Sequence, residues 1–219
     1  MDLHRFDTLL RSGADSFTVS ISPDQAEQLY RYYQELLRWS KKINLISKNA
    51  GDEEVVENHF IDSAALLTVV EGGGRLLDIG SGAGFPGLVC KAVRDDLPVT
   101  LVEPRLKRVS FLKHVIRTLG LSGIDVHAQR LEDGIEIPGE DECRWVVSRA
   151  VADITEFLVM CGRFKRPSTS VVCMKGPRWR EEFDESREAA NGWELTRVHA
   201  YRLPRSGARR NLLVFQGKK

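Results

Sequence analysis

The sequence predicts a doubly wound α/β fold with a mostly parallel, seven-stranded sheet and an N-terminal helical extension. Short apolar runs alternate with helix-period segments after residue 74, and a glycine-rich loop follows the first run. The first 72 residues show only helical signals. Repeated strand–helix units form parallel sheets that are covered by helices on both faces. We therefore expect residues 1–72 to form the extension and residues 73–219 the α/β domain.

The helical extension has one clear start signal. Ser22 is followed directly by a proline, and Gln25 lies three residues after Ser22. This is the pattern of an N-cap, a proline at the first helical position and a capping-box partner. Apolar residues then recur at helical spacing up to Trp39. A second helical stretch is expected over residues 53–70, and the three glycines at 72–74 are expected to be a linker.

The rest of the chain is predicted to alternate between strands and helices. Short apolar runs indicate strands, and amphipathic stretches, one of them stopped by a glycine, indicate helices. The last two strands have no helix between them, so a short loop should pair them antiparallel. In chain order, the expected strands are 75–79, 99–103, 124–128, 145–151, 170–174, 194–203 and 211–216, and the expected helices are 85–93, 105–119, 153–161 and 180–190.

Composition excludes several classes of protein. The 219-residue chain is 42% hydrophobic and 29% charged, as expected of a soluble globular protein. It has no apolar run of membrane-spanning length and no secretory signal core, so we expect a cytoplasmic protein without membrane contact. We also expect a monomer. The four cysteines lack CxxC spacing, which predicts buried, reduced thiols and no metal site.

Charge is nearly balanced overall, but basic residues gather toward the C-terminus. The formal net charge is +1, yet seven Lys and Arg residues and no acid follow Glu194. Such a segment either contacts phosphates or forms a solvated surface, and the sequence leaves both interpretations open. If the partner is a nucleic acid, we expect four arginines from separate loops to meet at the rim of the ligand site described next. They are Arg178, Arg205, Arg209 and Arg210.

The loop after the first strand predicts a nucleoside ligand. Residues 77–87 read Leu-Asp-Ile-Gly-Ser-Gly-Ala-Gly-Phe-Pro-Gly. Glycines allow tight turns and close approach of the backbone to a ligand, and ligands of such sheets bind at the carboxyl ends of the strands. Gly80 and Gly82 are therefore expected to border the ligand. Glu103, at the end of the second strand, is placed to bind ribose hydroxyls.

Two residues decide whether the predicted ligand is a dinucleotide or a sulfonium nucleoside. Residues 82–87 match GxGxxG, so an NAD-dependent oxidoreductase is the main alternative. However, Asp78 would repel a pyrophosphate, whereas it could accept a hydrogen bond, directly or through water, from a cationic amino-acid group. Pro86 also removes an N–H that a phosphate would use. We therefore predict S-adenosylmethionine as the cofactor, and with it a class I methyltransferase-like sheet.

The residues after the fourth strand narrow the choice of methyl acceptor. Enzymes acting on exocyclic base amines commonly carry Asn/Asp-Pro-Pro-aromatic there, whereas residues 147–151 contain neither proline nor aromatic. A Pro-Cys nucleophile for pyrimidine C5 is also absent from the sequence. A ring nitrogen such as guanine N7 has a lone pair and needs no general base, so positioning can do most of the work. His59, one helical turn before Asp62, is either catalytic or packs its helix.

With these motifs, the chain resembles the glucose-inhibited division protein B family, bacterial methyltransferases of guanine N7 in small-subunit ribosomal RNA. The resemblance covers nearly the whole chain. Its most specific carriers are Gly-Phe-Pro-Gly at 84–87 and Ser-Arg-Ala at 148–150. The other carriers are residues 39–46, 58–63, 77–83, 107–112 and 175–176.

The resemblance implies methyl transfer from S-adenosylmethionine to N7 of a guanosine in 16S ribosomal RNA, naked or within the small subunit. Matching positions imply cofactor contacts from Gly80, Phe85, Leu131, Glu132 and Arg149. Leu131 departs from the smaller residue that the family often has there. The family's catalytic residues are not carried over; Arg149 and Lys175, both at strand ends, are candidates for steering the guanine or its phosphate. A non-catalytic RNA-binding protein is the second alternative.

Overall fold

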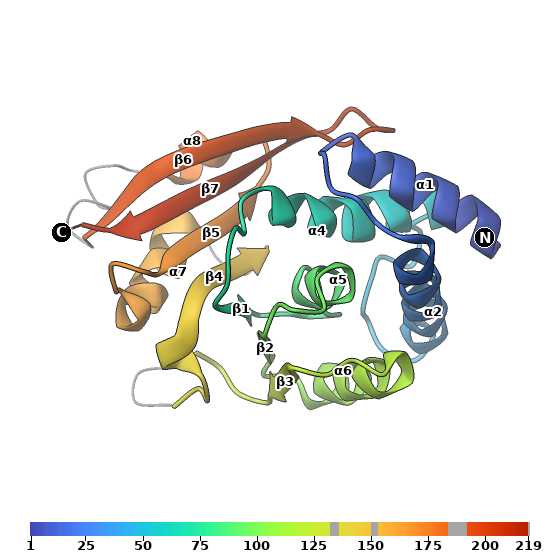
Figure 1. Ribbon diagram of the computed structural model, residues 1–219, viewed down its shortest axis with the longest axis horizontal. Coiled ribbons are helices and arrows are strands. Elements are labelled where there is room, and N and C mark those ends of the chain that lie inside the picture. The colour runs from blue at the N-terminus through green and yellow to red at the C-terminus, as the bar shows by residue number, and fades with distance from the viewer. Residues whose placement is uncertain (132–135, 150–152, 184–191, 219) are drawn as a thin grey trace.

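The computed structural model describes residues 1–131, 136–149, 153–183 and 192–218, and a seven-stranded sheet runs through its centre (Figure 1). The strand order is β3-β2-β1-β4-β5-β7-β6. All neighbouring pairs are parallel except β5–β7 and β7–β6. The predicted fold class is thus confirmed. The strands are β1 (Arg75–Ile79), β2 (Val99–Val102), β3 (Ile124–His127), β4 (Cys143–Arg149), β5 (Ser170–Lys175), β6 (Trp193–Arg202) and β7 (Arg209–Gly217).

Successive strand residues point to opposite sides of the sheet, so its apolar side chains face both ways and helices cover both faces. In β1, Leu76 packs into a core with α5 (Gly87–Val93) and α6 (Leu106–Leu119), while Leu77 packs into a second core with α7 (Ile154–Met160) and α8 (Trp179–Glu182). Gly120 adopts a left-handed conformation (φ 65°) and ends α6 as predicted.

The N-terminal segment forms two long helices and then a run of short helical turns. α1 (Leu3–Asp15) begins where the Asp2 side chain accepts a hydrogen bond from the Arg5 amide (2.8 Å); the sequence reading did not delimit this helix. α2 (Pro23–Ser40) begins with the predicted capping box. The predicted helix over 53–70 appears as α3 (Asp52–Val55), a π-helical turn η1 (Val56–Ile61), α4 (Asp62–Ala64) and a 3-10 turn η2 (Ala65–Thr68).

These N-terminal helices share one core with the sheet. The buried Tyr32 hydroxyl on α2 donates a hydrogen bond to the Ala83 carbonyl in the glycine loop. The Tyr32 ring also stacks on Phe85 with 5.3 Å between centroids. The packing is therefore continuous across the glycines at 72–74, and the division into 1–72 and 73–219 stays a prediction about chain organisation.

Some predicted boundaries shift. α5 begins at Gly87, after the turn that holds the glycine loop, and not at residue 85. β7 begins at Arg209, earlier than predicted, because its pairing with β6 extends to Arg202 opposite Arg209. The predicted helix over 180–190 and the end of the predicted strand 145–151 fall partly outside the described residues. All four cysteines are free and buried, as predicted. No helix in the described part of the chain is both long and apolar enough to cross a bilayer.

Candidate functional site

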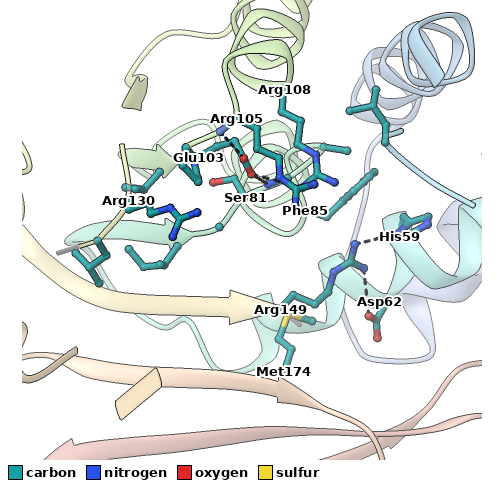
Figure 2. Close-up of a pocket in the computed structure, with 18 of the residues that line it drawn as sticks. His59, Asp62, Ser81, Phe85, Glu103, Arg105, Arg108, Arg130, Arg149 and Met174 are labelled. Carbon is teal, nitrogen blue, oxygen red and sulfur yellow. Dashed lines mark hydrogen bonds and ion pairs between the residues drawn. The ribbon is translucent and has the colours of Figure 1, made fainter. Parts of the chain in front are cut away.

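A cleft of about 900 Å³ lies at the carboxyl ends of the parallel strands (Figure 2). Its walls come from the glycine loop after β1, the ends of β2, β4 and β5, the segment after β3, and the π-helical turn of the N-terminal region. This volume is typical of small-molecule sites. The predicted site residues that line it are Gly80, Gly82, Phe85, Glu103, Leu131, Arg149 and Lys175. Glu132 lies outside the described residues.

The glycines of the loop have two different roles. Gly80 (φ 71°) and Gly82 (φ 60°) occupy the left-handed region and line the cleft, so they present backbone there without a side chain. The Gly80 amide also donates to the Val102 carbonyl (2.8 Å), which ties the loop to β2. Gly84 instead allows close packing, because a Cβ there would lie 2.8 Å from the Tyr32 hydroxyl.

Glu103 is fixed at the edge of the cleft by backbone hydrogen bonds. Its Oε2 atom accepts from the Gly82 amide (2.9 Å) and its Oε1 atom from the Arg105 amide (2.8 Å). The Arg108 guanidinium lies 3.8 Å from Oε2. Glu103 is only 2% exposed, so the carboxylate is rigidly held in a nearly dry position. Each oxygen keeps a further lone pair for a ligand hydroxyl.

Asp78 lies near the end of β1, as predicted, but its side chain does not enter the cleft. Its side chain is fully buried behind the glycine loop and does not line the cleft. Oδ2 accepts a hydrogen bond from the Gly87 amide at the start of α5 (2.9 Å), and Oδ1 has no partner among the described residues. Of the direct and water-mediated cofactor contacts that the sequence allowed for Asp78, a direct one does not fit this position, where the residue anchors the loop to α5. Burial raises the pKa of this carboxyl to about 7, although the Gly87 hydrogen bond opposes the shift.

The raised pKa of Asp78 predicts a specific pH dependence of stability. The folded state holds the proton up to about pH 7, whereas the unfolded chain releases it near the ordinary pKa of 3.8. The free energy of unfolding should therefore fall as pH rises from about 4 to 7, by up to about 4 kcal/mol from this group. In urea unfolding, Asp78→Asn should gain stability relative to wild type across this window. A difference between the two proteins that stays constant from about pH 4 to 8 would contradict the assignment.

Arg149 joins β4 to the N-terminal region. Its Nη1 donates to the Asn58 carbonyl (2.7 Å) and lies 3.5 Å from Asp62 Oδ2, and its Nη2 lies 3.0 Å from His59 Nδ1 (Figure 2). The guanidinium carbon also sits 5.2 Å from the centre of the Phe85 ring. These contacts hold the planar group at the cleft wall, next to the glycine loop.

His59 supports Arg149 and is not a proton carrier near neutral pH. Its ring stacks on Phe85 with 5.1 Å between centroids. Burial lowers the pKa of His59 to about 3, and the Arg149 charge acts in the same direction. The neutral ring can accept a hydrogen bond from Arg149 through Nδ1. Of the two interpretations left open by the sequence, the structure favours the packing role.

Of the four arginines expected at the rim, only Arg210 lines the cleft. Its Nε lies 3.6 Å from Asp62 Oδ1. Arg209 precedes it on β7 and points to the other face of the sheet, because side chains alternate along a strand. Arg205 turns away to Glu53, 2.7 Å from its Nε. Arg178 is exposed and does not line the cleft, so the predicted cluster is wrong for three of its four members.

Sequence reasoning missed three arginines that do line the cleft. Arg105 and Arg108 follow β2, and Arg130 follows β3. The available signal was their position directly after parallel strands, whose carboxyl ends form the ligand edge of such sheets. Lys175, which was predicted, lines the cleft and pairs with Glu182 at 2.6 Å. Among the described residues, six cations and three acids line the cleft, so its lining is basic on balance.

Sheet order, glycine loop and cleft together define an α/β protein of the class I methyltransferase-like fold. M. jannaschii TYW2 in complex with AdoMet superposes with a TM-score of 0.59 at 14% identity, over 81% of this chain and 80% of that one. A mutant of MtNAS in complex with S-adenosylmethionine gives a TM-score of 0.53 at 17% identity, over 97% and 73%. At such identities the likeness concerns the fold.

Sequence comparison gives the family. The family model described as rRNA small subunit methyltransferase G matches residues 25–213. The Ribosomal RNA small subunit methyltransferase G of Desulfotalea psychrophila is 47% identical over 94% of this chain and 96% of that protein. Its namesake in Myxococcus xanthus is 38% identical over 98% and 99%. The chain belongs to the rRNA small subunit methyltransferase G family. The predicted family and enzyme class are confirmed, against the oxidoreductase alternative.

Proposed function

We propose that this protein transfers the methyl group of S-adenosylmethionine to N7 of a guanosine in 16S ribosomal RNA. Besides the family, one observation carries the proposal. The cleft combines a nucleoside-type wall, made of the glycine loop and Glu103, with a wall of guanidinium groups and no cleft-lining histidine that titrates near neutral pH in the described part of the chain. The proposal includes action in the cytoplasm, since ribosomal subunits are the proposed substrate. It also includes the expectation that the protein acts as a monomer.

The residues of the nucleoside wall fit the cofactor. Gly80 and Gly82 offer backbone without side chains, Glu103 offers carboxylate lone pairs for ribose hydroxyls, and Leu131 offers apolar surface for a purine. When bound, S-adenosylmethionine supplies an electrophilic methyl group on a positively charged sulfur. Tyr32 packs behind the loop, where its ring stacks on Phe85 and its hydroxyl donates to the Ala83 carbonyl, so the loop is held in place before any ligand enters.

The wall of guanidinium groups suits a base that needs orientation and no deprotonation. The N7 lone pair forms the new bond to the methyl carbon while the carbon–sulfur bond breaks, so no proton is removed. His59, with a pKa of about 3, is too weak a base to draw a proton from a substrate efficiently. The guanidinium groups of Arg149 and Arg210 can donate hydrogen bonds to guanine O6 or to a nearby phosphate. Their shared partner Asp62 fixes both guanidinium groups.

The Glu103 carboxylate gives a direct test of the nucleoside wall. Glu103→Ala should weaken S-adenosylmethionine binding by about five- to a hundredfold, because ribose hydroxyls left unpaired cost roughly 1–3 kcal/mol. The loss should be smaller for a 2′-deoxy analogue of the cofactor, measured by titration calorimetry. The matched control is Glu194→Ala, an exposed acid on β6. If Glu103→Ala and wild type bind the cofactor equally, Glu103 only anchors the loop backbone.

Transfer itself is tested with radiolabelled S-adenosylmethionine and small ribosomal subunits from cells that lack the protein. We expect label to enter 16S ribosomal RNA, and to fail to enter subunits from cells that already contain the protein. Label in ribosomal proteins, or none at all on unmodified subunits and on the naked RNA, would contradict the proposal.

A further inference from the structure

Two segments beside the cleft carry basic residues and no acid. Residues 36–51 contain four cations, and residues 104–124 contain five. Neither segment has an Asp or a Glu. Of the 32 basic and 31 acidic residues in the chain, this leaves 23 basic and 31 acidic residues elsewhere. The net charge of +1 therefore conceals a strongly basic region and an acidic remainder.

The fold brings these two segments together at the cleft. α2 and α6 lie side by side (Figure 1), and the Trp39 ring at the end of α2 is 5.6 Å from the Phe111 ring on α6. The Arg108 guanidinium donates to the Asn44 carbonyl (3.3 Å), which fixes the loop after α2 against the start of α6. Arg108 and Arg105 also line the cleft itself (Figure 2). The basic region and the cofactor site therefore form one continuous surface.

Most of these cations are exposed and are not neutralised. Within the described residues, no ion pair is formed by the exposed side chains of Lys41, Lys42, Lys48, Arg105 and Lys107. The nearby acid Glu35 is engaged with Arg38 and His114, each at 2.6 Å. Glu103 is buried and accepts two backbone amides. The surface thus presents positive charge to solvent with little local compensation.

The start of α6 adds to this field. Its first turn has no acidic residue and no side-chain cap, and Lys107 and Arg108 lie there. The buried Glu103 carboxylate accepts the Arg105 amide and lies 3.8 Å from Arg108, so it offsets Arg108 and leaves the exposed Lys107 without an acidic partner among the described residues. Cations at a helix N-terminus are unfavourable, because the helix dipole is positive at that end. An anion bound there would relieve this repulsion. The arrangement favours an anionic partner that runs past the cleft.

We propose that this surface, made of Lys41, Lys42, Lys48, Arg105 and Lys107, holds the phosphate backbone that flanks the target nucleotide of the RNA. The inference rests on the proposed function and deepens it. It places the RNA on the N-terminal region and α6, in contrast to the C-terminal arginines that the sequence first suggested. RNA fits this surface because successive phosphates can bind cations from both segments while one base enters the cleft.

The test compares wild type with the triple variant Lys41→Ala, Lys42→Ala and Lys107→Ala. Binding of a fluorescent 16S ribosomal RNA fragment is measured from about 50 to 200 mM salt, a range in which each phosphate contact changes affinity by about threefold. The variant should bind more weakly at low salt, and its slope of log affinity against log salt should be smaller by about 2. Its affinity for S-adenosylmethionine and its thermal unfolding should match wild type.

The matched control is Arg178→Ala, Arg209→Ala and Lys218→Ala, which removes the same charge from exposed positions elsewhere. It should keep most of the wild-type salt slope. If both variants lose slope equally, or only the control does, the proposed surface is wrong, and the second result would restore the C-terminal arginines. Methyl transfer by wild type is measured separately. If wild type methylates the subunit while the triple variant behaves like wild type, only the surface assignment fails.

Discussion

Gly80→Arg is expected to abolish measurable binding of S-adenosylmethionine, with a loss of at least about a hundredfold, or roughly 2.7 kcal/mol. Gly80 has φ 71°, lines the cleft and donates its amide to Val102. A long side chain at this position would occupy the space where the backbone meets the ligand. Titration calorimetry with S-adenosylmethionine and S-adenosylhomocysteine measures the effect.

The matched control for this variant is Gly120→Arg. Gly120 has a similar backbone conformation (φ 65°), ends α6 and has no atom near an added Cβ. The strain of a non-glycine residue at positive φ is thus comparable in the two variants, whereas only Gly80 borders the cleft. Both should lose similar thermal stability, and only Gly80→Arg should lose the cofactor. Equal affinity in wild type and Gly80→Arg would show that the ligand lies elsewhere.

Arg149→Ala is expected to lower kcat by about a hundredfold or more, while cofactor affinity falls by no more than about tenfold. Misplacement of reacting groups by about 1 Å is enough for a loss of this size. Arg149 is the one side chain that touches Asn58, His59 and the Phe85 ring together among the described residues. Its loss leaves Asp62 with Arg210 and with the Tyr201 hydroxyl at 2.8 Å, so that buried carboxylate keeps partners.

Arg149→Lys separates charge from geometry. Lysine keeps the positive charge but lacks the planar fork that reaches Asn58 and His59 and contacts the Phe85 ring. We expect Arg149→Lys to recover only a small part of kcat. Arg197→Ala, at an exposed arginine on β6, should retain wild-type kcat. A kcat for Arg149→Ala within about twofold of wild type would remove Arg149 from the reacting site.

The sheet and the glycine loop were predictable from sequence because local patterns determine them. Each parallel strand is a short apolar run, and Gly120 is a local stop signal for α6. α1 was not delimited, although Asp2 offers an N-cap and Phe6 and Leu10 have helical spacing. The polar residues between them make that pattern weak in the sequence, and the buried face of α1 is defined by its packing on α2 and η1.

The candidate site was only partly predictable, because side-chain direction at a strand end depends on distant neighbours. Asp78 was expected in the cleft but turns behind the loop, where the Gly87 amide meets it. Arg149 and His59 are 90 positions apart in sequence, and no local pattern predicts that they meet. Alternation along β7 decided that Arg210, and not Arg209, reaches the cleft. The cationic wall of the cleft therefore could not be predicted from the sequence and was identified from the structure.

The most direct test of the proposed function is mass spectrometry of 16S ribosomal RNA nucleosides from cells with and without the protein, followed by the same measurement on unmodified subunits treated with purified protein and S-adenosylmethionine. We predict one 7-methylguanosine that is missing without the protein and is restored by wild type but not by Gly80→Arg. An unchanged nucleoside profile, or a restored methyl group on another atom or base, would contradict the assignment of guanine N7 in 16S ribosomal RNA.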